Sequence, residues 1–448
     1  MHPTATESRD HQISGRNKAL AIILWSLVCI GVLIRLINPF FSNPLDFLVT
    51  DPLRHYMSAK VCLQTGINPA VFYEIIDPPG YQIWLSTILR ITAGDRNAIA
   101  LYTGVLSIIT PWLWYRWMCL ALGNKRLALI GYAILSLLPD WIKLYQFFLQ
   151  ETLLLPLLGL SLWMSWRVRE SGTANRYVAS GLAWGFTLMT KLTALPAAVI
   201  TLGWLLVKSR SDKGAKRLAL ISIAIALGLF CMGPWKIYNR IHAFVPFPPG
   251  DYHRLWYESG KKDLRFIVKF NDNQQGFKEY LVEAASPSLD LQTAPFINWR
   301  TNRTGTCEMT IDFTQTPDKY LPPSRITFED RLRYTAENIM FFFFGLSWPE
   351  NYVEKDKELG VLHTALKSSR LIWLPITLAI LALAARQRRR DIMVVLFGTT
   401  LAFFLFQQSI ILEARYIKPW EGIAIATLLS LAKRRSSQQA ETVSIDNS

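Results

Sequence analysis

The chain has 448 residues, of which 51% are hydrophobic, and it carries a formal net charge of +15. A soluble chain of this length is seldom so apolar, and the apolar residues here come in long blocks rather than in alternating or helical stripes. The 5 cysteines are scattered and contain no Cys-x-x-Cys pair, which argues against a disulfide framework.

The basic residues gather in short loops between the apolar blocks. These loops lie at 124–126, 167–176, 208–217, 386–390 and 433–435. Short loops rich in Lys and Arg mark the cytoplasmic side of a membrane protein. No segment interleaves aromatic and basic residues, so the charge indicates membrane topology and no nucleic-acid partner is expected.

About ten apolar blocks have the length that a helix needs to cross the hydrocarbon layer. They lie at 19–37, 98–118, 127–145, 148–166, 177–191, 192–207, 218–235, 371–385, 391–411 and 418–432. Crossing at each block places every basic loop on one side, with both chain ends in the cytoplasm. Two shorter apolar pieces, 81–91 and 339–348, are predicted to be helices that lie at the outer interface or are re-entrant. The chain is therefore predicted to be an all-α polytopic membrane protein with a small mixed extracytoplasmic domain.

This topology divides the chain into five predicted parts. They are a cytoplasmic tail (1–18), an N-terminal transmembrane module (19–235) with a first outer loop (38–97), an extracytoplasmic domain (236–335), a C-terminal transmembrane module with an interfacial helix (336–432), and a second cytoplasmic tail (433–448). The last residues, "SSQQAETVSIDNS", are polar and are expected to be disordered.

Three acids stand where the chain meets the outer side of the membrane. Asp51 precedes Pro52, which suits the first position of a helix, so Asp51 is expected to be the N-cap of that helix. Asp77 begins the rigid turn "DPPG". Glu151 opens an otherwise apolar span, where a carboxylate is costly and is either a functional group or an acid favoured by the helix dipole.

Cations are also concentrated at the predicted outer ends of the spans, against the positive-inside tendency. They are Lys143, Lys191, Lys236, Arg240, Arg415 and Lys418. Some of them are expected to extend to lipid headgroups. Together they suit a phosphate held at the outer leaflet, to which Lys and Arg donate charge-assisted hydrogen bonds.

Several motifs in collinear order carry a family resemblance. "TDPLRHYMSAK" and "DPPGYQIWL" in the first outer loop are followed by "QETLLLPLLGLSL", "GFTLMTKLTALPAAVI", "GPWKIYNRIHAFVPF" and "EARYIKPWEGIAIA". This series resembles the glycosyltransferase C-fold (GT-C) enzymes, in particular the bacterial relatives of dolichyl-phosphate-mannose protein mannosyltransferases and the aminoarabinose transferases that modify lipid A. The resemblance covers the membrane core, whereas residues from about 250 to 335 match no motif.

The resemblance implies transfer of a sugar from a polyprenyl-phosphate donor to a glycan, lipid or protein acceptor. The implied location is a bacterial inner membrane, with the active site facing the periplasm. By position, Asp51 corresponds to the acid that binds or deprotonates the acceptor hydroxyl, with Asp77 and Glu151 as further catalytic candidates. The candidate substrate-binding residues are Arg54, His55, Tyr56, Tyr81, Lys191, Lys236, Arg240, Arg415 and Tyr416.

The chain departs from the family pattern at two positions. Pro52 stands where a second acid is common, and Asp77 stands where a Lys or His often precedes the two prolines. Either another cation contacts the donor phosphate, or Asp51 and Asp77 hold a divalent cation, or the chain is catalytically weak. No other cofactor is expected.

Two non-enzymatic functions are alternatives. A transporter or flippase for lipid-linked sugars should place ionisable or helix-breaking residues near mid-membrane, whereas the acids and cations here collect at one face. A non-catalytic protein of envelope polysaccharide assembly would need neither Asp51 nor the outer cations. The glycosyltransferase is the favoured prediction.

Overall fold

The computed structural model describes residues 5–48, 50–65, 79–210, 212–232, 371–408 and 414–445, four strand segments between 264 and 311, and positions 336 and 343. Its α-helices are α1 (Ala5–Phe41), α2 (Thr50–Thr65), α4 (Pro79–Thr92), α5 (Arg96–Leu122), α6 (Lys125–Leu137), α7 (Pro139–Leu144), α8 (Gln150–Glu170), α9 (Ala174–Thr190), α10 (Leu195–Lys208), α11 (Lys213–Met232), α17 (Trp373–Arg386), α18 (Ile392–Gln408) and α19 (Lys418–Ile445). Short 3-10 turns are η1 (Pro44–Phe47), η2 (Leu192–Ala194) and η4 (Ala414–Ile417).

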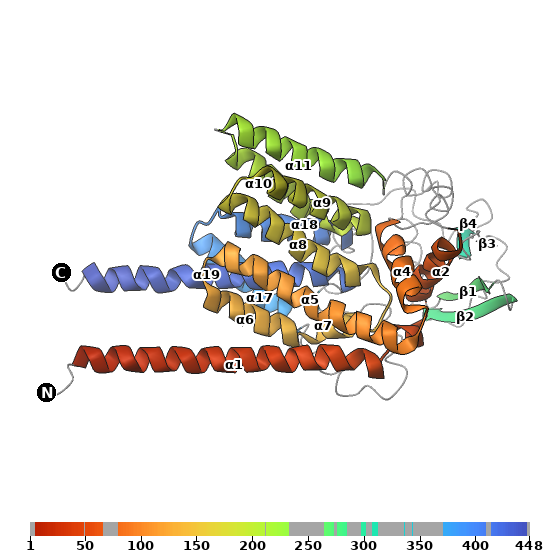
Figure 1. Ribbon diagram of the computed structural model, residues 1–448, viewed down its shortest axis with the longest axis horizontal. Coiled ribbons are helices and arrows are strands. Elements are labelled where there is room, and N and C mark those ends of the chain that lie inside the picture. The colour runs from red at the N-terminus through yellow and green to blue at the C-terminus, as the bar shows by residue number, and fades with distance from the viewer. Residues whose placement is uncertain are drawn as a thin grey trace.

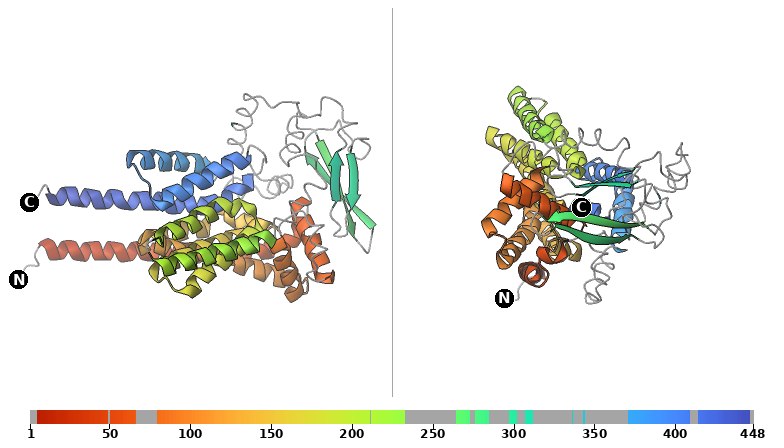
Figure 2. Two further views of the ribbon diagram at one scale, coloured as in Figure 1. Left: turned by 90° about the horizontal axis from the view of Figure 1, so that it is seen from above. Right: turned by 90° about the vertical axis from the view of Figure 1, so that its right-hand side faces the viewer.

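The long helices lie side by side as a bundle, and both chain ends project from the same end of it (Figure 1). Helices α2 and α4 lie across the opposite end, next to the strands. The view from above shows the same arrangement (Figure 2). The bundle therefore has one end with the termini and one end with α2 and α4, called here the α2/α4 end.

Two antiparallel hairpins lie in the segment predicted to form a mixed domain. Strand β1 (Leu264–Asp272) pairs with β2 (Gly276–Ala284) in the register Leu264↔Ala284. Strand β3 (Ile297–Thr301) pairs with β4 (Cys307–Ile311) in the register Ile297↔Ile311. In the described residues the strands are confined to this segment, and the rest of the fold is helical as predicted.

Every predicted span contains a described helix, but the number of crossings stays a prediction. Two helical stretches, Lys18–Phe41 of α1 and the whole of α5, are long and apolar enough to cross a membrane on their own. Shorter apolar helices are found at Leu192–Lys208, Trp373–Arg386 and Ile392–Phe403.

The prediction of one continuous span over 127–145 is wrong. This segment forms α6 and then the short helix α7, and the break falls at Leu138, whose backbone is extended (φ −63, ψ 114). Pro139 explains the break, because its ring disfavours helical geometry at the preceding residue and suits the first turn of a new helix.

The C-terminal tail also differs from the prediction of disorder, since α19 continues as a helix to Ile445. After Gly422 the sequence of α19 contains no glycine or proline, and Ala, Gln, Glu, Lys and Arg have high helix propensity. At the other end, α1 begins at Ala5, well before the apolar block. The polar tails are thus helical extensions of the terminal spans.

Large apolar side chains cover much of the outer surface of the bundle. In α1, Ile22 is 67% exposed and Phe41 is 81% exposed, and α11 and α17 also carry exposed Ile and Leu side chains. A soluble protein rarely exposes apolar patches of this extent. This surface fits a helical bundle surrounded by lipid.

Tryptophans fill the interior of the bundle. Trp114 contacts Trp117 and Trp141 edge to face at 5.5 and 5.6 Å between ring centroids. A β-carbon built on Gly159 or Gly422 would lie 2.9 or 2.5 Å from the Trp114 ring, so only glycine lets α8 and α19 approach this indole closely. The indole nitrogen of Trp114 donates to the Leu155 carbonyl at 3.0 Å, which satisfies its buried polar atom.

A buried arginine fixes α1 against the bundle. Arg35 is 1% exposed and donates to the carbonyl oxygens of Leu135, Ser136 and Ser107 at 2.7, 2.8 and 3.2 Å, and to the Ser107 hydroxyl at 2.9 Å. Such bonds are what a guanidinium requires where water is excluded. Arg35 thereby joins α1 to α5 and α6.

Candidate functional site

The predicted site residues of the first outer loop lie on α2, at the α2/α4 end. The helix begins at Thr50, so the prediction that Asp51 is its N-cap is wrong, and Asp51 lies within the first turn. A carboxylate there is still favoured by the helix dipole. Arg54 donates to Asp51 at 2.8 Å, and the Asp51 side chain is 28% exposed, so this carboxylate is charged, anchored and open to solvent.

One turn further along α2, His55 meets the start of α4. Its Nδ1 lies 3.0 Å from the Gln82 amide nitrogen, and its ring contacts Tyr81 edge to face at 5.1 Å. His55 and Tyr81 are 2% and 0% exposed. Burial raises the pKa of Tyr81 well above its ordinary value, so this phenol keeps its proton. Tyr56, on the neighbouring face of α2, stacks on Phe148 at 5.8 Å.

The predicted acid Glu151 and the predicted cation Lys191 form a buried ion pair. Glu151 lies in the first turn of α8, and Lys191 follows the last residue of α9, so the ammonium donates to Glu151 from a neighbouring helix end. The two side chains are 1% and 11% exposed. Lys191 also lies over the Tyr416 ring, 4.1 Å from its centroid, as a cation–π contact.

Contacts between helices bring these groups into one region. A β-carbon built on Gly80 would lie 3.0 Å from the Met189 backbone, so α4 begins directly against the end of α9. Tyr81 and Thr152 line one pocket, and Glu151 directly precedes Thr152 in α8. Tyr81, Glu151, Lys191 and Tyr416 therefore form one cluster, called here the acid–lysine cluster, at the α2/α4 end.

The sequence did not single out Asp140 or Glu421, which lie in a second buried polar cluster. Lys418 Nζ lies 3.7 Å from Asp140 Oδ1 and donates to the Asp140 carbonyl at 3.2 Å, and both side chains are fully buried. The Trp141 indole donates to Glu421 at 2.7 Å. This cluster joins α7 to α19, close to Tyr416 in the chain. The rule that ionisable residues in apolar segments are functional candidates would have selected both acids.

The remaining candidates cannot be placed in either cluster. Asp77, Lys236 and Arg240 lie outside the described residues, and Arg415 is described only as backbone of η4. Lys143, another predicted outer cation, is a buried side chain of α7. Within the described ranges, no three His, Cys, Asp or Glu side chains are grouped as metal ligands. Pairing of Asp51 with Asp77 around a divalent cation stays a prediction.

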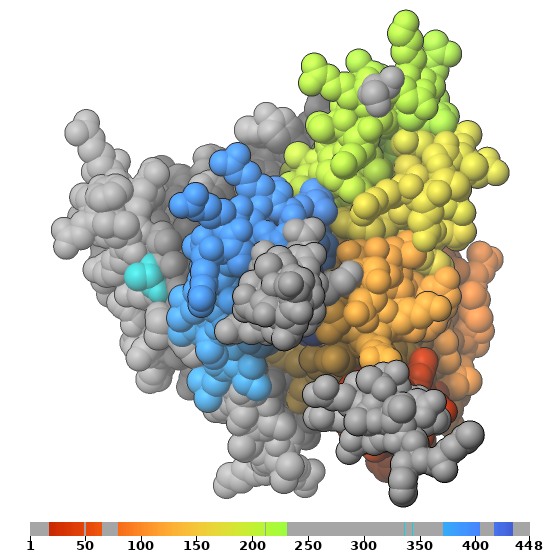
Figure 3. Space-filling model, turned by 90° about the vertical axis from the view of Figure 1, so that its left-hand side faces the viewer, coloured from red at the N-terminus to blue at the C-terminus, as the bar shows by residue number. Residues whose placement is uncertain are grey.

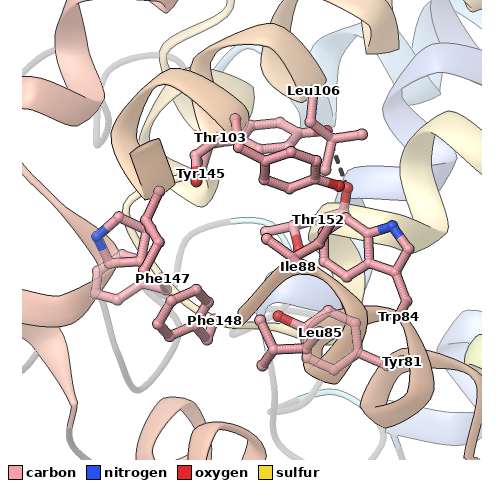
Figure 4. Close-up of a pocket in the computed structure, with 13 residues that line it drawn as sticks. Tyr81, Trp84, Leu85, Ile88, Thr103, Leu106, Tyr145, Phe147, Phe148 and Thr152 are labelled. Atoms are coloured by element: carbon pink, nitrogen blue, oxygen red, sulfur yellow. Dashed lines mark hydrogen bonds between the residues drawn. The ribbon is translucent and has the colours of Figure 1, made fainter. Parts of the chain in front are cut away.

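A narrow aromatic pocket adjoins the acid–lysine cluster. Its free volume is about 10 Å³, and its walls come from α4, α5 and the segment between α7 and α8 (Figure 4). Tyr81 and Thr152 connect the pocket to the acid–lysine cluster, because Thr152 follows Glu151 in α8. The wall is almost entirely Phe, Tyr, Trp, Leu and Ile. Such a lining keeps water away from the nearby ion pair, which strengthens electrostatic interactions there.

The fold and the site define a helical integral membrane protein with buried acid–cation pairs near one end of its bundle. Residues 77–238 match the family described as dolichyl-phosphate-mannose-protein mannosyltransferase. The match confirms the relationship to the GT-C glycosyltransferases that the motifs predict, and it points to glycosyltransferase activity. It includes Tyr81, Glu151 and Lys191, whereas Asp51 and Tyr416 lie outside it. No curated protein matches the chain.

Proposed function

We propose that this protein transfers a sugar from a polyprenyl-phosphate donor to an acceptor hydroxyl at the outer face of the membrane. The observation that carries the proposal is the buried Glu151–Lys191 pair, which lies within the segment matched to the mannosyltransferase family. A membrane protein that retains an ion pair in so dry a place has a functional reason for it more often than a structural one.

Lys191 is assigned to the phosphate of the donor. An ammonium has three N–H donors, and the contact with Glu151 uses one of them. The side chain keeps 11% of its surface exposed, which leaves access for a phosphate oxygen. As the bond from sugar to phosphate breaks, negative charge develops on that oxygen, and a fixed cation stabilises it. Lys236, Arg240 and Arg415 are assigned as additional phosphate ligands by their motifs.

Asp51 is assigned to the acceptor. In the proposed step the acceptor hydroxyl oxygen attacks the anomeric carbon, its proton passes to Asp51, and the donor leaves as a lipid phosphate. Arg54 donates to Asp51 at 2.8 Å and orients the carboxylate. Tyr56 is assigned to the acceptor as well, and the buried His55 and Tyr81 are assigned to position α2 against α4. Asp77 is assigned as a second acid of the same loop.

The membrane orientation and the roles of the predicted domains belong to the same proposal. The α2/α4 end faces the periplasm of a bacterial inner membrane, and the basic loops face the cytoplasm, because short loops rich in Lys and Arg stay inside. The 236–335 segment, with its two hairpins, is then an extracytoplasmic domain that shapes the choice of acceptor.

The proposal is tested by transfer of radiolabelled sugar from polyprenyl-phosphate donors in isolated membranes. Asp51→Asn should lower the rate by about 10²- to 10⁴-fold, the typical contribution of a general base. Glu170→Gln is the control, since Glu170 is an exposed acid at the far end of α8. Its rate should stay within about twofold of the wild-type rate. Equal rates for wild type and Asp51→Asn, at equal protein levels, would exclude Asp51 as the base.

A further inference from the structure

At the opposite end of the bundle, five elements border a second cavity, which is open to the surface. It has a volume of about 680 Å³ and lies between the ends of α5, α8 and α10, the start of α18 and the middle of α19. Figure 3 looks onto this end, from which the termini project. The cavity is far larger than the aromatic pocket and involves none of the residues assigned to sugar transfer.

Three cations from three different elements line this cavity. Arg169 comes from the end of α8, Lys208 from the end of α10, and Arg390 from the turn before α18. Among the described residues, none of these side chains forms an ion pair or a hydrogen bond with an acid. The acid in the wall, Asp391, already accepts a hydrogen bond from Arg389 at 2.6 Å. The cavity wall therefore carries an excess of positive charge.

Helix dipoles account for only part of this arrangement. Cations at the ends of α8 and α10 are favoured by the negative pole of each helix. Arg390, however, lies two residues before the start of α18, near the positive pole of the helix, which disfavours a cation and favours an anion. An anion in the cavity would interact favourably with all three cations and with this helix terminus.

Much of the remaining wall is apolar. Leu122, Met393 and Val395 line it, and the Trp204 indole stacks on Trp166 with 5.0 Å between ring centroids. Tryptophan is enriched at the level of lipid headgroups. Three cations together with an apolar lining fit a phosphate attached to acyl chains better than a small soluble anion.

We propose that this cavity binds the phosphate headgroup of an anionic phospholipid from the leaflet that faces the basic loops. Basic pockets between membrane helices on the cytoplasmic side bind such headgroups in general. The lipid would fasten α18 and α19 to α5, α8 and α10 at an end where the cations otherwise repel one another.

The test is lipid binding to the full-length protein in detergent, measured by native mass spectrometry with phosphatidylglycerol and phosphatidylcholine of equal chain length. The wild type should bind phosphatidylglycerol at least about tenfold more tightly. A triple variant, Arg169→Gln, Lys208→Gln and Arg390→Gln, should lose about 100-fold in affinity, or about fivefold per cation. The matched control removes three exposed cations of α11 at the same end, in the variant Lys213→Gln, Lys216→Gln and Arg217→Gln. It should lose less than about threefold.

Further measurements distinguish a loss of lipid binding from a loss of folding. They also distinguish a lipid ligand from free inorganic phosphate. Arg390→Lys should keep the affinity within about threefold, whereas Arg390→Gln should lose about fivefold. Without added lipid, the thermal midpoint of the triple variant should equal or exceed that of the wild type. An equal loss in both triple variants, or equal binding of the two lipids, would overturn the proposal. Displacement of the lipid by millimolar inorganic phosphate would make the free anion the ligand and would overturn the assignment to a lipid.

Discussion

At the scale of single residues, the buried pair of Glu151 and Lys191 has two separable roles. It joins the start of α8 to the end of α9, and in the proposed reaction it positions the ammonium for a phosphate. A buried ion pair adds little net stability, but loss of one partner leaves an uncompensated buried charge. Stability and activity should therefore respond differently to single and double substitutions.

Glu151→Gln alone and Lys191→Met alone should each lower the free energy of unfolding by about 3–5 kcal/mol. The double variant should recover most of this stability, because no charge is left buried, but it should still lack transferase activity. Denaturant unfolding in detergent and the sugar-transfer assay measure the two effects. Glu170→Gln, at the exposed far end of α8, is the control and should change stability by less than about 0.5 kcal/mol. Full activity in the double variant would contradict the role of Lys191.

The individual members of this pair were predictable from the sequence, but the pairing was not. An acid at the start of an apolar span is visible as a costly local feature, and so is a lysine between two apolar blocks. Their contact depends on how α8 packs against α9, which no local pattern specifies. The Trp141–Glu421 bond, between residues 280 positions apart, was unpredictable for the same reason.

At the scale of elements, the first outer loop is tied to the bundle by a bidentate ion pair. Arg96, at the start of α5, contacts both carboxylate oxygens of Asp46 in η1 at 2.5 and 2.6 Å. Asn43 reinforces this junction, since its amide donates to the Arg96 carbonyl at 2.9 Å. The pair fixes the point from which the chain enters α2 and reaches Asp51.

This junction should have a defined pH dependence. The hydrogen bond from Arg96 lowers the pKa of Asp46 below its ordinary value. A lowered folded-state pKa contributes stability that is present above the ordinary carboxyl pKa, about 3.9, and is lost as the pH falls through the folded value. The wild type should therefore unfold at a higher temperature than Asp46→Asn at pH 7, and the difference should shrink steadily as the pH falls below the ordinary carboxyl range. Because the pair is partly exposed, the difference at pH 7 should be small and should shrink further in high salt. A difference that does not change with pH would show that Asp46 acts through its neutral contacts.

Helix boundaries were predicted well where an apolar block ends at charged residues. They were predicted poorly where a proline or the helix propensity of a polar segment sets the end of the helix. The start of α9 and the end of α10 fall within a few residues of the predicted limits, because a basic loop adjoins each of them. The apolar composition of 127–145 continues through Pro139 and therefore hides the break between α6 and α7. In α19 the apolar pattern stops near residue 432, but helix propensity carries the backbone to Ile445.

At the scale of the whole molecule, the two ends of the bundle differ in whether they contain buried ion pairs. The α2/α4 end contains two buried acid–lysine pairs, Glu151–Lys191 and Asp140–Lys418. At the end with the termini, the cations are exposed and the turns are short. A transporter would be expected to place such groups near the middle of the membrane, so this asymmetry favours chemistry at one face.

The same asymmetry predicts the orientation of the protein in its membrane. In a cysteine-free background, Arg90→Cys places a thiol on the exposed side of α4, and Lys213→Cys places one at the exposed start of α11. A membrane-impermeant maleimide should label the first variant in intact cells and the second only after permeabilisation, since basic loops are retained on the cytoplasmic side. The cysteine-free background removes labelling of the native thiols. Among these, Cys62 would react slowly in any case, because burial raises the pKa of its thiol to about 11 and leaves little thiolate. The reverse labelling pattern would place the acid–lysine cluster on the cytoplasmic side, and a donor available only at the outer leaflet could then not reach Lys191.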